Sequence, residues 1–451
     1  MAIASKRFPE MPFSPFRFLA PTLVVLVLFG PAQAAPRVRA DSIVYRVVRG
    51  DNLYTLAARN FRRPGDYIVV QRLNRIVDPR RLSIGSLLTI PRSVLRQEPI
   101  EAEVRSFRGR VLAGAEGNLR AVLVGTKIGE GYRIETGSNS FITLRLPDGS
   151  DVALPSQTSL RVERLRRTAM AGSVERTFRI EKGRAGASVT PMGDPYSDFR
   201  FSTPAAVSAV RGTRFRMSYD PEANRAASEV LEGKVAFAPA DVAEERMLPA
   251  GFGTANGLSG PVHLLPPPEL ALPDRVQDET HLRFTLNPLA EAKRYHLQIA
   301  ADAGFLDVLD ETITDSTEAV FDPLGNGDYF VRATGIDANG LEGLPATYAF
   351  RRRLNRIKVS AEEVRTGRYR QYLFRWQAPD AQRAQYRFQL SASPDGTKPL
   401  VDEPALRETA FMITDLPAGT YYWRVMSRDY DEGQVYQKWS PFQELRIGRA
   451  R

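Results

Sequence analysis

The sequence predicts a multidomain, mainly β protein made of a small strand-helix-helix-strand (βααβ) module, a β-rich domain and two β-sandwiches. Three observations carry this prediction. A short stretch near the N-terminus changes from strand to helix periodicity and back, a long middle segment holds many short strands between turns, and the C-terminal part contains an internal repeat. The length of 451 residues suggests about three domains, and the small all-β units raise this number to about four.

Residues 1–34 have the pattern of a secretory signal peptide. Basic residues precede an apolar run from Leu19 to Phe29, and Ala32-Gln33-Ala34 supplies the small residues that favour cleavage near Ala34/Ala35. An uncleaved anchor is the alternative, but the run is short against the roughly 20 apolar residues of a spanning helix. No second long apolar segment follows. We therefore expect a periplasmic protein without stable membrane insertion after cleavage.

Composition narrows the chemistry further. The chain has 0 Cys, which in an exported protein excludes a disulfide framework and a lipid-modified N-terminal Cys. The formal charge of +10 favours acidic polymers, and both peptidoglycan stem peptides and nucleic acid qualify. Export argues against nucleic acid. The basic residues Arg161, Arg164, Arg166 and Arg167 show no recognition pattern and predict a solvated face.

The small module near the N-terminus is framed by two strands. Residues 45–48 alternate and predict the first strand, and residues 87–90 before Pro91 predict the closing strand. Apolar spacing between them predicts two short helices, which the break at Pro64-Gly65-Asp66 separates. Asp51 is placed to accept bonds from the free N–H groups of a helix that starts at Asn52.

This module, residues 43–93, resembles a LysM carbohydrate-binding module. The residues that carry the resemblance are Tyr45, Val47, Gly50, Asp51, Leu53, Ala57, Leu73, Asn74, Gly85, Leu88 and Pro91. Asn52 stands where the family usually has Thr. The resemblance implies a ligand that contains N-acetylglucosamine, which in a bacterial envelope means the peptidoglycan backbone.

The resemblance also implies where the glycan would bind, in a shallow groove between residues 50–53 and residues 76–80. Backbone groups would hold the acetamide, apolar side chains would cover the sugar face, and Gly50 would allow close backbone approach. The candidate glycan-binding residues are Gly50, Asp51, Asn52, Leu53, Asn74, Ile76, Val77, Asp78, Pro79 and Arg80. A structural alternative stays open for single residues, because Asp51 could serve only as a helix cap and Asn74 only as a turn residue.

The middle of the chain predicts an antiparallel or rolled β domain at residues 108–239. Residues 94–107 are polar and predict a linker or a loosely packed strand ahead of it, after which many short strands alternate with turns. A Pro-rich stretch at residues 240–270 predicts a semi-rigid spacer, so that the C-terminal half would stand off from the first two modules.

The β domain resembles a FecR-type periplasmic domain through several blocks in the right order. These blocks are Val124-Gly125 through Gly129, Ile134-Glu135-Thr136-Gly137, Leu146-Pro147-Asp148-Gly149-Ser150, Thr203 to Val207, Val210 to Phe215 and Val230 to Val235. In the family's namesake this domain relays an outer-membrane signal to a cytoplasmic sigma factor, behind a cytoplasmic tail and a transmembrane helix. Here a signal peptide and a LysM-like module come first, which argues against sigma-factor regulation.

One turn of the β domain has two readings. Gly212, between two strands, predicts an unusual backbone angle, with Arg211 pairing to a local acid. A ligand site at Arg211-Gly212-Thr213 is the alternative.

The C-terminal part, residues 271–353 and 356–448, contains an internal repeat. Residues 288–299 align with 379–390, and residues 324–333 with 416–425. Each copy resembles a fibronectin type III or immunoglobulin-like sandwich. The expected core residues are Trp376 and Trp423 in the second copy and Phe284, Leu286 and Val331 in the first.

Chemistry-bearing residues are sparse. The three histidines, His263, His281 and His296, are not spaced as metal ligands, and no nucleophile-base pattern is present. We expect no catalytic site, no metal site and no cofactor.

The sequence therefore favours a non-enzymatic periplasmic protein that binds peptidoglycan and presents its FecR-like and sandwich domains to another envelope component. Two alternatives stay open. The chain could be a signal-sensing or regulatory protein that acts through its FecR-like domain, or an accessory subunit or divergent hydrolase of the cell wall. The sequence does not name the partner, the oligomeric state or the process served.

Overall fold

The structure is a computed structural model that describes residues 42–240, 245–354, 356–366, 369–380, 384–431 and 433–448. The expected signal peptide, residues 1–34, lies outside the described residues. The described chain divides into two compact units, an N-terminal module that ends at Val94 and a larger unit from Leu95 onward, with residues 60–62 grouped with the larger unit. No helix in the described part has the length and apolar character that crossing a membrane requires.

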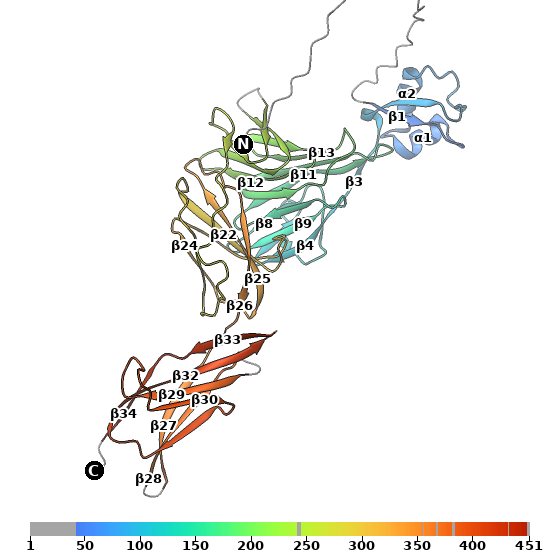
Figure 1. Cartoon of the computed structure of the whole chain (residues 1–451). Helices are drawn as coiled ribbons and strands as arrows, with labels where there is room; N and C mark the ends of the chain where they lie inside the picture. The colour runs from blue at the N-terminus through green and yellow to red at the C-terminus, as the bar shows by residue number, and fades with distance from the viewer. Residues whose placement is uncertain are drawn as a thin grey trace, which may run out of the picture. The chain divides into compact units, whose positions relative to one another are not determined.

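The N-terminal module has the predicted order of a strand, two helices and a strand (Figure 1). Its elements are β1 (Ser42–Arg46), α1 (Leu53–Asn60), a 3-10 turn (Pro64–Asp66), α2 (Tyr67–Leu73), β2 (Leu87–Pro91) and a second 3-10 turn (Arg92–Val94). The two strands pair antiparallel, with Tyr45 opposite Leu88. β1 ends two residues earlier than predicted because the chain turns at Val48, whose carbonyl accepts the N–H of Asp51 at 3.2 Å.

The larger unit begins with strands that close into a barrel. The strands are β3 (Gln97–Pro99), β4 (Ala102–Arg108), β5 (Val111–Gly114), β6 (Arg120–Ala121), β7 (Lys127–Ile128), β8 (Arg133–Thr136), β9 (Phe141–Arg145), β10 (Asp151–Leu154), β11 (Ser159–Thr168), β12 (Val174–Ser188), β13 (Asp198–Ser202), β14 (Ala206–Val210), β15 (Arg214–Asp220), β16 (Arg225–Glu232), β17 (Lys234–Pro239), β18 (Arg246–Pro249), β19 (Phe252–Ala255) and β20 (Val262–His263). The long strand β12 joins the two sides, because its first half pairs with β11 and its second half with β10 and β15. The pairing of β12 with β13 is parallel.

The barrel core is built around four phenylalanine side chains from strands β12, β13 and β15. Phe178, Phe199, Phe201 and Phe215 are all buried. Their ring centroids lie 5.4 Å apart for Phe199 and Phe201, and 5.2 Å apart for Phe201 and Phe215. Each fully buried ring contributes about 1.5–3 kcal/mol relative to exposure, so this cluster holds the two sides of the barrel together in the absence of disulfides.

The barrel extends beyond both limits that the sequence suggested. In the segment expected as a linker, β4 pairs with β9. In the segment expected as a Pro-rich spacer, β18 pairs with β17 and β19 pairs with β16. The spacer prediction was wrong for these residues, because Pro249 is the last residue of its strand, where proline is tolerated, and alternating apolar residues such as Leu248 pack into the core.

The rest of the larger unit consists of two β-sandwiches. The first has the pair β21 (Leu282–Thr285) and β24 (Glu318–Phe321) facing a sheet of β23 (Val308–Thr314), β22 (Arg294–Ala300), β25 (Gly327–Ile336) and β26 (Ala346–Arg352). The second has β27 (Lys358–Thr366), β28 (Tyr369–Gln377) and β31 (Ala410–Thr414) facing β30 (Val401–Leu406), β29 (Gln385–Ser391), β32 (Gly419–Asp431), β33 (Gln434–Trp439) and β34 (Gln443–Ile447). The expected core residues Trp376, Trp423, Phe284, Leu286 and Val331 are all buried.

The first sandwich does not stand off from the barrel, contrary to the prediction from the prolines. The hydroxyl groups of Ser106 and Thr143 on the barrel both donate to the carbonyl oxygen of Leu306 in the sandwich. Phe141 of the barrel shares an apolar cluster with Phe305 and Val308. The barrel and the first sandwich therefore share an interface with both polar and apolar contacts.

The turn at Gly212 confirms the expected unusual backbone angle. Gly212 has φ +116°, and an added Cβ would lie 2.6 Å from the Cα of Pro191. Arg211 does not pair with an acid, since its guanidinium donates to the carbonyl oxygens of Asp194 and Pro195 at 2.6 and 2.8 Å. Main-chain carbonyls thus take the place of the expected carboxylate.

We expect Gly212→Ala to lower the free energy of unfolding by about 1 to 3 kcal/mol, because the new methyl group meets both backbone strain and the Pro191 backbone. Gly251→Ala is the matched control. Gly251 also has a positive φ, +82°, but open space around an added Cβ. Thermal or urea unfolding should show the larger loss for Gly212→Ala, and equal losses would contradict the role of the Pro191 contact.

Candidate functional site

The two loops that the sequence singled out for glycan binding lie together in the N-terminal module. The main-chain N–H of Leu53 donates to the carbonyl oxygen of Pro79 at 2.9 Å. The Leu53 side chain is fully buried, with 0% exposure, so it packs in the module core and cannot cover a sugar. Leu53 therefore holds residues 50–53 against residues 76–80, and the surface between these loops comes from other side chains.

The helix cap is Asn52 rather than Asp51. The side-chain oxygen Oδ1 of Asn52 accepts the N–H of Thr55 at 2.9 Å, and the Thr55 hydroxyl accepts the N–H of Asn52 at 3.1 Å. Asp51 instead accepts the N–H of Val48 at 2.9 Å and the hydroxyl of Tyr45 at 2.8 Å. The prediction was one residue off because α1 starts at Leu53, and Asp51 closes the preceding turn.

Asn74 ties the second helix to the closing strand. Its Nδ2 donates to the carbonyl oxygens of Val70 at 2.8 Å and Thr89 at 2.7 Å, and its Oδ1 accepts the N–H of Thr89 at 2.7 Å. The side chain thus bonds to two elements on either side of residues 76–80. These bonds hold together the elements before and after the loop at residues 76–80. Asn74, a predicted glycan-binding residue, therefore positions the loop.

The second loop presents an apolar side chain on a fixed backbone. Ile76 is anchored by its N–H to the carbonyl oxygen of Gln71 at 3.0 Å, and the Asp78 carboxylate accepts the N–H of Arg80 at 2.9 Å. Between these anchors the Val77 side chain is 96% exposed. An apolar side chain held in water in this way is available to cover the face of a sugar ring.

In the first loop, residues 50–53, Gly50 leaves open space beside the backbone. Gly50 is exposed, has φ +94°, and an added Cβ would meet nothing within 4 Å. Its positive φ, rather than crowding, requires glycine at this turn. The space in front of Gly50 is therefore open to a ligand.

Sequence reasoning missed an aromatic pair on the same module. Tyr54, the second residue of α1, and Tyr67, the first residue of α2, have ring centroids 4.6 Å apart at 52°. Tyr54 is exposed and directly follows the first loop. Nothing in the sequence pattern relates two tyrosines on different helices, so only the helix packing shows this pair.

Comparison with known families identifies two segments of the chain. Residues 45–91 match the LysM domain family. Residues 132–236 match the FecR protein family. The first match covers the module with the two loops, and the second covers strands β8 to β16 of the barrel and the first half of β17. Each match describes a part of the chain only.

Solved structures show more distant similarity. A candidate anti-sigma factor from Parabacteroides distasonis is 23% identical over 29% of this chain and 59% of that chain, with a TM-score of 0.24. This chain thus spans less than two thirds of that protein. A two-domain fibronectin type III segment of chicken tenascin is 17% identical over 41% of this chain and 99% of that one, with a TM-score of 0.21. No curated protein matches.

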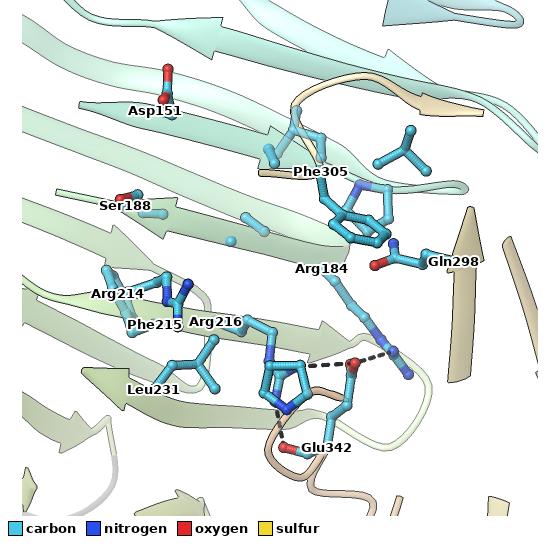
Figure 2. A pocket seen from close by; sticks show the side chains of 18 of the residues that line it. Asp151, Arg184, Ser188, Arg214, Phe215, Arg216, Leu231, Gln298, Phe305 and Glu342 are labelled. Carbon is cyan, nitrogen blue, oxygen red and sulfur yellow. Dashed lines mark hydrogen bonds and ion pairs between the residues drawn. The ribbon is translucent and has the colours of Figure 1, made fainter. Parts of the chain in front are cut away.

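A second polar site lies where the FecR-like barrel meets the first sandwich. Its centre is the buried carboxylate of Glu342, which precedes β26 and is 7% exposed (Figure 2). On the barrel side, Arg184 on β12 donates to this carboxylate at 3.1 Å, and Arg216 on β15 forms an ion pair with it at 3.0 Å. His296 on β22 contacts it from the sandwich side at 3.0 Å.

The second ring nitrogen of His296 completes a chain of charges. It lies 3.0 Å from a carboxylate oxygen of Glu311 on β23. Burial of the ring disfavours its charged form, but Glu342 and Glu311 outweigh burial and raise the pKa of His296. Burial also opposes the charge on Glu342, yet Arg216, His296 and Arg184 hold the pKa of this carboxyl well below its usual range. The interface therefore contains a compensated ionic network.

Glu229 on β16 is the exception in this network. Burial raises the pKa of the Glu229 carboxyl to about 7, although Arg216 acts in the opposite direction. Its oxygen Oε1 accepts the main-chain N–H of Glu342 at 3.3 Å, so the acid also bonds across the domain interface. Within the described residues, no group of His, Asp and Glu side chains is arranged to hold a metal ion.

The arginines of β11 form pairs with acids instead of a binding face. Arg161 lies 3.2 Å from Glu116, and Arg167 lies 3.4 Å from Glu98. The other two arginines that the sequence singled out have carboxylate partners as well. The basic cluster is thus an ion-paired strand surface, as the sequence favoured.

Glu229→Gln is expected to remove part of the pH dependence of stability. The folded protein holds this proton up to about pH 7, whereas the unfolded chain releases it near the ordinary value of 4.5. The stabilisation is therefore complete below pH 4.5 and is lost as the pH rises through 7. Between pH 6 and 8 the wild-type protein should lose about 1 kcal/mol more unfolding free energy than the variant.

Unfolding of the full chain by heat or urea at the two pH values measures this difference. Glu232→Gln is the control, because Glu232 is at the exposed end of the same strand. The control should keep the wild-type pH dependence. If Glu229→Gln kept it as well, the buried proton would not lie on Glu229.

Proposed function

We propose that this protein binds the N-acetylglucosamine-containing backbone of peptidoglycan through the groove between residues 50–53 and 76–80. The observation that carries the proposal is the direct bond between the two loops, Leu53 N–H to Pro79 O, within a segment that matches the LysM domain family. The open space at Gly50 admits an acetamide, and the exposed Val77 covers a sugar face. The binding step needs no catalytic residue, metal or cofactor.

The rest of the chain then serves to present surfaces in the periplasm. The FecR-like barrel and the first sandwich form one interface, so a partner meets them as one surface. LysM and FecR domains are binding and regulatory modules, which supports a non-enzymatic role. The proposal includes cleavage of the signal peptide near Ala34/Ala35 and two fibronectin-like repeats at residues 271–353 and 356–448. The partner is another envelope protein.

A second candidate function is signal sensing through the FecR-like barrel. The observation that favours it is the match of residues 132–236 to the FecR protein family. A pull-down from crosslinked envelopes separates the two functions. Recovery of an outer-membrane receptor or a regulator of transcription would support sensing, whereas recovery of structural wall components alone would support anchoring.

Val77→Asp is expected to weaken binding of the full chain to purified peptidoglycan about tenfold, or about 1.4 kcal/mol, because a carboxylate replaces the apolar cover of the sugar. The parent should bind with a Kd in the range of about 1 μM to 1 mM, typical of a single shallow groove. Cosedimentation at several peptidoglycan concentrations gives both values, and soluble N-acetylglucosamine oligomers should compete.

Val44→Asp is the matched control. Val44 is 49% exposed in the middle of β1, opposite Thr89 on β2 and in neither loop, so the same substitution there should leave binding unchanged. A salt series separates groove binding from the attraction of a basic protein to an acidic wall, since at 1 M salt the Debye length is about 3 Å. Equal loss in both variants, or loss of parent binding in salt, would refute the groove.

A further inference from the structure

The FecR-like barrel and the first sandwich line a partly open cavity of about 170 Å³ between them (Figure 2). A water molecule needs about 10–15 Å³ by this measure, so the space holds on the order of ten waters. That is room for an organic molecule of about ten non-hydrogen atoms. No part of the glycan proposal uses this space, which lies in the other compact unit of the chain.

On the barrel side, two small residues that lie side by side leave space for the cavity. Ala153 on β10 is the cross-strand neighbour of Gly186 on β12, and Gly186 in turn pairs with Arg216 on β15. A Cβ added to Gly186 would meet only ordinary contacts, the nearest at 3.8 Å from Arg216. The sandwich side contributes Phe305 and Leu306, so the walls around this floor are largely apolar.

One cation lines the cavity without a carboxylate partner. The guanidinium of Arg332 on β25 lies 4.1 Å above the ring centroid of Phe305 and donates to the Gln298 side-chain oxygen at 2.6 Å. Among the described residues, no carboxylate forms an ion pair with Arg332. Burial lowers the pKa of Arg332 to about 10, which reflects the cost of holding this charge away from water.

The second sandwich contains the same Gln–Arg pair, and there two rings cover the arginine. Gln389 and Arg424 are register partners there, as Gln298 and Arg332 are in the first sandwich. The Arg424 guanidinium lies over two rings, those of Trp439 at 4.1 Å and Phe442 at 4.4 Å. In the described part of the chain, the Arg332 guanidinium lies over the ring of Phe305 only, and it also lines the cavity. In the first sandwich the cavity therefore takes the place of a second ring.

The other charges around the cavity are already compensated. Glu342 is bonded to Arg184, Arg216 and His296, and Arg214 pairs with Glu232 at 2.7 Å. Asp151 is bonded by Arg145. Glu229 is protonated below about pH 7. Arg332 is therefore the cation at the cavity that no carboxylate of the described residues contacts directly, although Glu342 favours its charge from a greater distance.

We propose that this cavity binds a small amphipathic carboxylate, with its apolar part over Ala153 and Gly186 and its carboxylate on Arg332. A guanidinium is the side chain best suited to hold a carboxylate, and the partly buried setting strengthens the pair. A medium-chain fatty acid and the C-terminus of an apolar peptide share this chemistry. Either ligand would contact both domains and so stabilise their interface.

Calorimetric titration of the full chain with octanoate tests the proposal. Octanoate, with about ten non-hydrogen atoms, should bind with a Kd on the order of 100 μM, and octanol at least tenfold more weakly. Octylammonium should not bind. N-acetylvaline, a peptide-like carboxylate of about the same size as octanoate, is the second probe. Its affinity relative to octanoate shows whether a peptide C-terminus is preferred to a fatty acid, and its C-terminal amide should bind at least tenfold more weakly. Equal affinity for octanoate and octanol, or no binding of either carboxylate, would overturn the proposal.

Three variants locate the site. Arg332→Gln should weaken octanoate at least tenfold without changing octanol, whereas the repeat-equivalent Arg424→Gln should change neither. Gly186→Val fills the cavity from a strand position that has no positive φ, so it should abolish binding of both ligands while the fold is retained. Unchanged octanoate binding in Arg332→Gln or in Gly186→Val would place the ligand elsewhere and refute the site.

Discussion

The buried carboxylate of Glu342 is the interaction on which the larger unit depends. A carboxylate in this position is costly unless it is fully paired, and here two arginines of the barrel and one histidine of the sandwich supply the partners. Removing one partner of such a network typically costs about 3–5 kcal/mol, because the others stay buried and uncompensated. The network thus fixes how the first sandwich meets the barrel, and the cavity beside it follows from that geometry.

The N-terminal module follows a different logic. It is a separate compact unit whose two loops are held by main-chain bonds and by Asn74. If the proposed groove binds a glycan, a single shallow site of this kind binds weakly, so strong retention on a polymer needs several copies that engage it together. The proposed glycan site on one unit and the ion-paired interface in the other are consistent with the proposal of a protein that binds the wall while it contacts a partner.

Local patterns in the sequence predicted most of the fold. The strand and helix order of the small module, the core tryptophans Trp376 and Trp423, and the positive φ of Gly212 all follow from short-range periodicity and turn chemistry. The cap was misplaced by one residue because Asp51 and Asn52 are both good caps, and only the start of α1 decides between them. The Pro-rich segment was misread since the pairing that makes β18 and β19 strands comes from distant residues.

The site at the interface between the barrel and the first sandwich could not be predicted, because its residues also come from distant parts of the sequence. The sequence showed only that His296 is not spaced as a metal ligand, and its partners Glu311 and Glu342 are 15 and 46 positions away. The internal repeat was visible, but not that its Gln and Arg form the same pair in both copies, because the strand register had to be known first. Contacts between domains leave no periodic signal in a single sequence.

The central claim is that one groove, formed by residues 50–53 and 76–80, binds the glycan. Amide hydrogen exchange of the full chain, with and without a soluble N-acetylglucosamine oligomer, tests it most directly. The account predicts that added protection is confined to these two loops and the adjoining first turn of α1, with the barrel and both sandwiches unchanged. Protection that appears on the barrel or the sandwiches, or none at saturating oligomer, would contradict it.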